Sequence, residues 1–140
     1  MPLAHGYTLQ HAAPALADYL SPRSRAGLSP KTAAQGEAAL RGSWFVVHVL
    51  APSGATVGMG RVIGDGGWYF HIADMAVLPE HQRRGIGEAI LSSLIQHIRQ
   101  VAPPDPYITL LADAPGQKLY TRHGFVPTAP HSEGMRLTKR

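Results

Sequence analysis

The strongest constraint on the fold is a change of hydrophobic period between two apolar segments. From Gly85 to Val101 apolar residues recur every third or fourth position, which predicts an amphipathic helix. The flanking segments, 68–77 and 107–111, are rich in β-branched and aromatic residues and predict strands. A strand, a helix and a second strand in this order form a βαβ unit, so the two strands should lie parallel in one sheet.

Antiparallel strands are predicted ahead of this unit. Segments 44–50 and 56–63 have the composition of strands, and a weaker strand is expected at 7–9. The sequence Asp65-Gly66-Gly67 predicts a hairpin turn that leads into strand 68–77. Antiparallel strands followed by one parallel pair indicate an α+β class with a mixed, mostly antiparallel sheet.

The remaining elements are short. Their expected positions are helices at 14–20, 31–40 and 114–123, and strands at 125–127 and 135–137. Segment 21–30 is rich in Pro, Ser and Gly and predicts a loop, and Asp113 is expected to cap the helix that follows it. The sheet would then have six to seven strands with about four helices, in a single domain over residues 1–140.

Composition excludes several function classes. The 140 residues include no cysteine, which excludes disulfides, cysteine nucleophiles, iron–sulfur clusters and thiolate zinc sites. Thirteen Lys and Arg against nine Asp and Glu give a formal charge of +4, which suits an anionic ligand such as a nucleotide cofactor, nucleic acid or acidic lipid. The early basic residues Arg23, Arg25 and Lys31 are expected on a solvated face.

The sequence predicts neither a targeting segment nor a metal site. Its first residues lack the basic and then apolar layout of a secretion signal, and no apolar run approaches the roughly 18 residues of a membrane span. The eight histidines include no pair with H-x-H or H-E-x-x-H spacing. A cytoplasmic protein with no membrane partner and no metal is therefore expected.

The most informative segment for function lies between strand 68–77 and the long helix. It is Gln82-Arg83-Arg84-Gly85-Ile86-Gly87. Glycines allow a tight turn, and the unpaired amides and dipole of a helix start favour a phosphate or diphosphate. Arg83 and Arg84 can add charge-assisted hydrogen bonds. The alternative is an ordinary loop before a helix. The segment is not G-x-G-x-x-G, and G-x-x-x-x-G-K-[ST] occurs nowhere in the chain.

Residues 74–87 resemble the acyl-CoA-binding motif of the GNAT superfamily of N-acetyltransferases. That motif is Q/R-x-x-G-x-G/A after a strand ending in V-x-P. Gln82, Gly85 and Gly87 fill its defined positions, and Val77-Leu78-Pro79 matches the end of the strand.

A second GNAT signature, N-x-x-A-x-x-x-Y followed by G-F, is similar to residues 113–125, with Tyr120 at the tyrosine position. Asp113 and Gly116 stand where the family has asparagine and alanine. The resemblance implies one N-acetyltransferase domain, with the acyl-CoA-binding motif at 74–101 and the tyrosine motif at 107–127.

The resemblance implies the GNAT fold, in which the fourth and fifth strands are parallel and splay apart to admit the pantetheine arm of acetyl-CoA. Acetyl-CoA would be the cosubstrate. Backbone groups at the end of strand 68–77 would bind its arm, and one amide would stabilise the oxyanion. The cofactor-binding residues implied are Met75, Ala76, Val77, Gln82, Arg83, Arg84, Gly85, Ile86, Gly87 and Asp113.

The implied reaction transfers an acetyl group from acetyl-CoA to a primary amine of a small molecule or peptide. Transfer should be direct, because no cysteine can carry the acyl group. Tyr120 is the candidate general acid for the departing thiolate, although a lone aromatic on a helix can simply pack. The alternative function is a non-catalytic acyl-CoA-binding or regulatory domain. A homodimer is compatible with the family, whereas scattered basic residues fit nucleic acid poorly.

The attacking amine needs a base, and Asp74 is the candidate. Its alternation with Phe70 and Ile72 predicts that it lies on an apolar face, where burial would raise its pKa. His71 and Glu80 lie nearby as alternatives. Asp74 can also be a structural carboxylate that accepts hydrogen bonds from backbone donors.

Overall fold

The structure, a computed structural model, describes residues 1–138. The chain forms two compact units, residues 1–110 and a shorter unit that begins at Leu111. The second unit contains the 3₁₀ helix η2 (Ala114–Gly116) and the helix α4 (Gln117–Arg122). That the whole chain works as one N-acetyltransferase domain stays a prediction.

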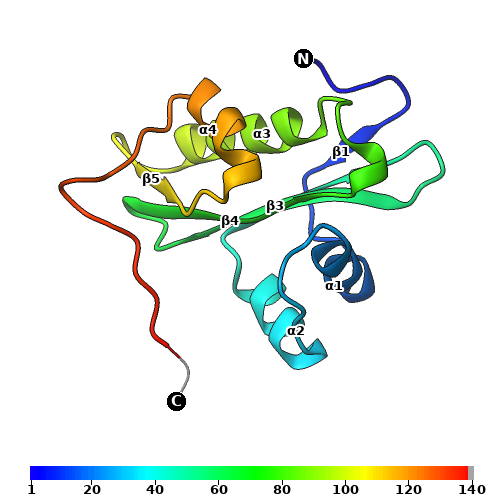
Figure 1. Cartoon of the computed structure of the whole chain (residues 1–140), viewed down its shortest axis with the longest axis horizontal. Helices are drawn as coiled ribbons and strands as arrows, with labels where there is room; N and C mark the ends of the chain where they lie inside the picture. Colours follow the sequence, from blue (N-terminus) through cyan, green and yellow to red (C-terminus); the bar gives the residue numbers. More distant parts are fainter. Residues whose placement is uncertain (139–140) are drawn as a thin grey trace. The chain divides into compact units, whose positions relative to one another are not determined.

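The first unit is built around a five-stranded sheet (Figure 1). Its strands are β1 (Thr8–Gln10), β2 (Phe45–Leu50), β3 (Thr56–Gly64), β4 (Tyr69–Val77) and β5 (Tyr107–Leu110). They lie in the order of the sequence, with antiparallel neighbours from β1 to β4 and a parallel β4–β5 pair. The predicted α+β class, mixed sheet and βαβ unit are confirmed.

Helices cover both faces of the sheet. The helix α3 (Ile86–Val101) packs on β2, β3 and β4, whereas α1 (Leu16–Arg25) and α2 (Ala33–Gly42) pack together, with α1 also against β3 and β4. Figure 1 shows α3 on one face of the sheet and α1 and α2 on the other. The alternation along β3 explains this arrangement. Its residue 60 faces Ile90 of α3, while Met59 packs with Tyr19 of α1.

The turn between β3 and β4 forms at the predicted Asp65-Gly66-Gly67 sequence. The Asp65 carboxylate accepts hydrogen bonds from the backbone amides of Gly67, Trp68 and Tyr69 at 2.8, 3.0 and 3.2 Å. These hydrogen bonds lower the pKa of Asp65. Asp65 therefore stabilises the turn itself.

Glycines in β3 let α3 approach the sheet closely. A Cβ placed on Gly60 would lie 2.6 Å from Ile90 Cγ2 and 2.9 Å from Met75 Sδ. One on Gly58 would lie 2.6 Å from Ile86 Cγ2. These distances are shorter than van der Waals contact, so β3 needs its glycines to keep α3 in place.

Gly60→Ala should therefore lower the free energy of unfolding by about 1–3 kcal/mol, because the added methyl group overpacks the sheet–helix interface. Urea denaturation measures this change. Gly42→Ala is the matched control, since residue 42 ends α2 and, in residues 1–138 beyond its chain neighbours and the helix backbone, no heavy atom lies within 4 Å of its Cβ position. A Gly60→Ala variant as stable as this control would contradict the close packing.

In the part of the chain that the structure describes, the sheet has five strands, so the expected six to seven strands are wrong. Residues 125–127 and 135–137 form no strand, and Val126, Met135 and Leu137 are 78%, 90% and 92% exposed. Both segments are only three residues long, and Pro127 cannot donate to a sheet hydrogen bond. Their apolar composition predicted strands, but neither segment pairs with a strand of the sheet.

The helix α1 runs further than predicted. The loop expected at 21–30 begins only after Arg25, and Pro22 lies inside the helix. A proline removes one helical hydrogen bond. Tyr19 and Arg23, on either side of it, are buried, and this tertiary packing outweighs the local propensity.

Candidate active site

A β-bulge in β4 organises the candidate site. Arg61 of β3 pairs with Ala73, and Met59 pairs with Ala76, so two steps along β3 correspond to three along β4. Asp74 is one of the two residues of β4 that lie between these pairs, where β3 has a single residue. Its φ of +57° is rare for a residue with a side chain. The bulge changes which face of the sheet each following side chain occupies.

The bulge overturns the predicted orientation of Asp74. Alternation with Phe70 and Ile72 predicted an apolar face, but Asp74 contacts Tyr19 and Arg23 of α1. One inserted residue shifts the side-chain alternation by one position, which exchanges the two faces of the strand. The sequence contains no proline or glycine at this point to reveal the bulge.

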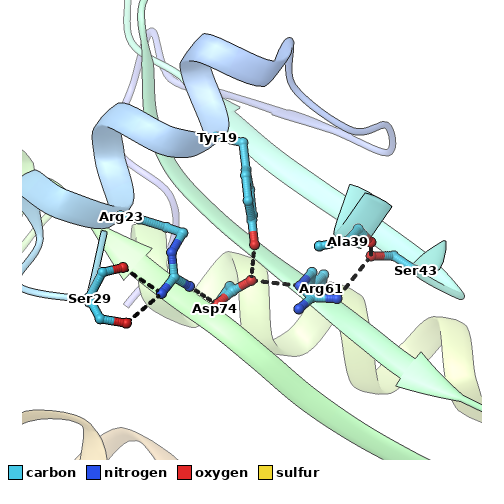
Figure 2. Close-up of polar contacts among 7 residues, drawn as sticks. All are labelled: Tyr19, Arg23, Ser29, Ala39, Ser43, Arg61 and Asp74. Carbon is cyan, nitrogen blue, oxygen red and sulfur yellow. Dashed lines mark hydrogen bonds and ion pairs between the residues drawn. The ribbon is translucent and has the colours of Figure 1, made fainter. Parts of the chain in front are cut away.

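Asp74 accepts hydrogen bonds from three side chains, as Figure 2 shows. Tyr19 Oη donates to Oδ2 at 2.5 Å, and Arg61 Nε donates to the same oxygen at 2.6 Å. Arg23 Nη1 donates to Oδ1 and forms an ion pair with it. The carboxylate thus ties α1 to both β3 and β4.

The two arginines have further partners. Arg23 Nη2 donates to the Ser29 carbonyl at 2.8 Å, and Arg61 Nη1 donates to Ser43 Oγ at 3.2 Å. The expected solvated face for Arg23 is wrong, because this residue is only 6% exposed. Burial of Arg23 follows from its position on α1, where it faces the bulge (Figure 2).

The pKa of Asp74 is lowered, and the expected rise is wrong. Burial acts to raise it, but hydrogen bonds from Tyr19 and Arg61 and the positive charges of Arg61 and Arg23 outweigh burial. Asp74 in turn raises the pKa of Tyr19, after the larger effect of burial on that phenol. The carboxylate therefore stays ionised at neutral pH.

His71 lies on the same face of β4 as Asp74, beside the parallel strand β5. Its Nδ1 lies 2.9 Å from Thr109 Oγ1, and the Thr109 hydroxyl donates to the Phe70 carbonyl at 3.4 Å. In the tautomer whose Nδ1–H donates to Thr109 Oγ1, Nε2 is the basic nitrogen of the ring. Burial and then the charge of Arg61 lower the pKa of His71, so the ring is neutral at pH 7.

Glu80, the other alternative base, has a different environment. It forms an ion pair with Arg25, and the two side chains are 50% and 54% exposed. Arg25 is thus on a solvated face as predicted. An exposed ion pair of this kind is a solvated surface contact.

The edge of β4 toward β5 is open beyond Ile72. The parallel pairing runs from Tyr69–Tyr107 to Ile72–Leu110, and in residues 1–138 no strand pairs with 73–77 on that side. This open segment contains Met75, Ala76 and Val77. Its free edge is able to bind an extended ligand through main-chain hydrogen bonds.

The glycine turn follows this open edge. Gly85 adopts a left-handed φ of +75° at the start of α3, and no side chain among residues 1–138 makes a cap hydrogen bond to that helix. Arg83 also has a positive φ of +63°, and Gln82, Arg83 and Arg84 are exposed. Uncapped helix amides beside exposed arginines form a suitable surface for a diphosphate.

In the second unit, Tyr120 lies on α4, half-buried, with its ring in edge contact with Phe125 at 6.1 Å between centroids. Burial, and then the charge of Asp113, raise the pKa of Tyr120, so its phenol is protonated at neutral pH. A Cβ on Gly116 would lie 2.7 Å from the Tyr120 ring, so the glycine makes room for it. The expected capping by Asp113 is wrong, because its side chain makes no cap hydrogen bond and η2 precedes α4.

Sequence reasoning missed Tyr19 and Arg23 as parts of the site. The two residues are four apart and lie on one face of α1. That spacing was visible in the sequence, but the helix was not predicted to continue beyond Leu20, and no bulge was predicted in strand 68–77.

Comparison with known proteins decides the family. The family model described as an acetyltransferase (GNAT) domain matches residues 41–127, more than half of the chain. The chain belongs to the GNAT family of acetyltransferases. Membership confirms the predicted family, whose class of chemistry is acyl transfer.

Solved structures resemble this GNAT chain along most of its length. A protein of unknown function from meticillin-resistant Staphylococcus aureus, described as a probable acetyltransferase, is 38% identical with a TM-score of 0.88, over 95% of this chain and 99% of that one. A GNAT family acetyltransferase from Streptococcus pneumoniae is 24% identical with a TM-score of 0.75, over 96% of this chain and 97% of that one, which is a likeness of fold alone.

A curated relative, an uncharacterized N-acetyltransferase named ycf52 from Pyropia yezoensis, is 29% identical over 100 residues. The match covers 69% of this chain and 56% of the relative, so the GNAT chain spans about half the length of that protein. Within residues 1–138, no helix has the length and apolar character needed to cross a membrane. Over the same residues, no three His, Asp or Glu side chains gather as a metal site would require.

Proposed function

We propose that this protein transfers the acetyl group of acetyl-CoA directly to a primary amine of a small molecule or peptide. The observation that carries the proposal is the open edge of β4 at 73–77, followed, after a short 3₁₀ helix at Pro79–His81, by the glycine turn and the start of α3. An extended pantetheine arm suits the open edge, and a diphosphate suits the helix start. The cofactor-binding residues proposed from the sequence motif, apart from Asp113, lie in these two segments.

In this proposal the acyl carbonyl lies beside the bulge. The attacking amine adds to the thioester carbon, and a backbone amide near Met75, Ala76 or Val77 stabilises the oxyanion. The C–S bond then breaks, and the thiolate takes a proton from the Tyr120 phenol, whose raised pKa keeps it protonated until that step. Asp113 is proposed to contact the cofactor near Tyr120.

The amine must lose a proton, and two groups on the α1 side of β4 can accept one. The Asp74 carboxylate already accepts three side-chain hydrogen bonds, and its lowered pKa makes it a weak base. His71 is neutral at pH 7, and Nε2 is its basic nitrogen in the tautomer whose Nδ1–H donates to Thr109. We therefore propose that His71 accepts the proton of the amine. Asp74, the base expected from the sequence, would instead hold Arg23 and Arg61 in position.

His71→Gln should lower kcat/KM at pH 7 by about 100-fold, at the low end of general-base effects because water can partly replace the ring. In the wild type, kcat/KM should fall as pH drops below His71's lowered pKa, which lies under 6.5. The variant should lose that acidic limb in a pH–rate profile. An unchanged profile in His71→Gln, with the limb lost instead in Asp74→Asn, would return the role to Asp74.

Free-thiol release from acetyl-CoA, measured with a panel of amines, tests the function as a whole. The proposal predicts thiol release that depends on an amine and yields the N-acetylated product. Binding of acetyl-CoA without turnover on any amine class would favour the non-catalytic acyl-CoA-binding domain. Action in the cytoplasm and assembly as a homodimer stay predictions.

A further inference from the structure

The N-terminal residues lie directly against the glycine turn. The Ala4 amide donates to the Arg84 carbonyl at 2.8 Å. A Cβ placed on Gly85 would lie 2.2 Å from the Pro2 carbonyl oxygen and 3.1 Å from the Leu3 nitrogen. The two backbones are therefore in contact, at a distance that only glycine permits.

This contact gives Gly85 a second reason to be glycine. The sequence indicates that the glycines make room for a ligand. On the side where a side chain of residue 85 would project, however, the structure has the Pro2 carbonyl. The shape of the turn thus depends on a segment about eighty positions earlier in the chain.

Tyr7 extends the contact along the turn. Its hydroxyl lies 2.8 Å from His81 Nδ1, and the two rings meet edge to face with centroids 5.8 Å apart. The Arg84 guanidinium lies over the Tyr7 ring, 5.9 Å from its centroid. One side chain therefore touches residues before and within the glycine turn.

The segment is also tied to the sheet. Gly6, with a φ of +85°, turns the chain against Pro52, and β1 then pairs with β2 from Thr8 opposite Leu50. A segment with one end in the sheet and the other on the turn can transmit the rigidity of the sheet to the turn. We call residues 2–7 the N-terminal brace.

We propose that the N-terminal brace holds residues 81–85 in the conformation that binds the diphosphate of acyl-CoA, with Tyr7 as a positioning residue. The proposal rests on the proposed function. Amides held in the binding geometry before the ligand arrives lose less conformational entropy on binding. The Arg84 guanidinium, packed over the Tyr7 ring, is likewise held in place before binding.

The test compares two acyl donors that differ in the diphosphate. Acetyl-CoA contains it, and S-acetylpantetheine lacks it. Tyr7→Ala should raise KM for acetyl-CoA by about 3- to 10-fold, the loss expected for one or two hydrogen-bond-sized contacts, with kcat unchanged. The kinetic constants for S-acetylpantetheine should not change. Tyr7→Phe, which keeps the ring over Arg84, should show a smaller increase and guards against a folding defect in Tyr7→Ala.

Tyr107→Phe is the matched control, because Tyr107 is a 46% exposed tyrosine paired with the opposite end of β4. It should leave both donors unaffected. Amide hydrogen exchange gives a second readout without any ligand, and residues 83–87 should exchange faster in Tyr7→Ala than in the control variant.

Each result has a distinct meaning. Equal losses with both donors, or unchanged exchange and KM in Tyr7→Ala, would overturn the brace and leave the proposed function intact. A wild-type protein that neither binds nor uses acetyl-CoA would overturn the proposed function, and the brace with it.

Discussion

Asp74→Asn should lower the free energy of unfolding by about 3–5 kcal/mol, the cost of breaking a buried ion pair from one side. The substitution leaves Arg23 and Arg61 with 8% and 15% exposed side chains and no carboxylate between them. The amide also offers one acceptor oxygen where the carboxylate has two, so it cannot accept from Arg23 on one side and from Tyr19 and Arg61 on the other. Urea denaturation followed by circular dichroism measures the change.

Glu80→Gln is the matched control for Asp74→Asn. It removes a carboxylate from an ion pair with Arg25 in which both side chains are at least half exposed. Exposed pairs contribute about 0–1 kcal/mol, so this variant should be close to wild type. Similar losses in the two variants would contradict the view that the Asp74 cluster is a buried anchor.

The same cluster predicts how stability depends on pH. The pKa of Asp74 is lower in the folded protein than its ordinary value of 3.8. Its contribution is therefore fully present above that ordinary value and is lost as pH falls through the folded pKa. Denaturation between about pH 5 and pH 2 should show a steeper loss of stability in wild type than in Asp74→Asn. Parallel pH curves would contradict a lowered pKa.

Tyr120→Phe should lower kcat by about 10²–10⁴-fold, because the phenyl ring keeps the packing against Phe125 but removes the proton that the thiolate needs. Binding of acetyl-CoA should change little, since the hydroxyl acts only as the C–S bond breaks. Steady-state kinetics together with a thermal-shift titration separate the two quantities.

Tyr69→Phe controls for the loss of a tyrosine hydroxyl elsewhere in the chain. Tyr69 is 42% exposed at the start of β4, and this variant should keep its kcat. A Tyr120→Phe enzyme with the rate of the control would remove the general-acid role from Tyr120. A fall in cofactor affinity with unchanged kcat would indicate a packing role instead.

Long periodic segments made the central part of the fold predictable. The pattern from strand 68–77 through the long helix to 107–111 determined both the parallel pair and the crossover, because apolar period and length agree over many residues. The turn at Asp65-Gly66-Gly67 was predictable for a different reason, since its residues suit only a tight reversal. Short segments such as 125–127 have too few residues for apolar period and length to support the same prediction.

The candidate site was only partly predictable. The glycine turn and Tyr120 could be singled out because each belongs to a local motif. The environment of Asp74 could not, because a bulge inverts the alternation at that point and its partners come from α1 and β3. The contact of Pro2 with Gly85 is likewise a long-range backbone contact that no local pattern encodes.

The central claim is that acyl-CoA binds with its diphosphate on the turn at 82–87 and its arm along 73–77. A crystal structure of the complex with coenzyme A tests this most directly. The account predicts diphosphate oxygens within hydrogen-bond distance of the backbone amides at the start of α3, and pantetheine paired with the open edge of β4. A diphosphate bound elsewhere, with the amides of this turn still solvated, would contradict it.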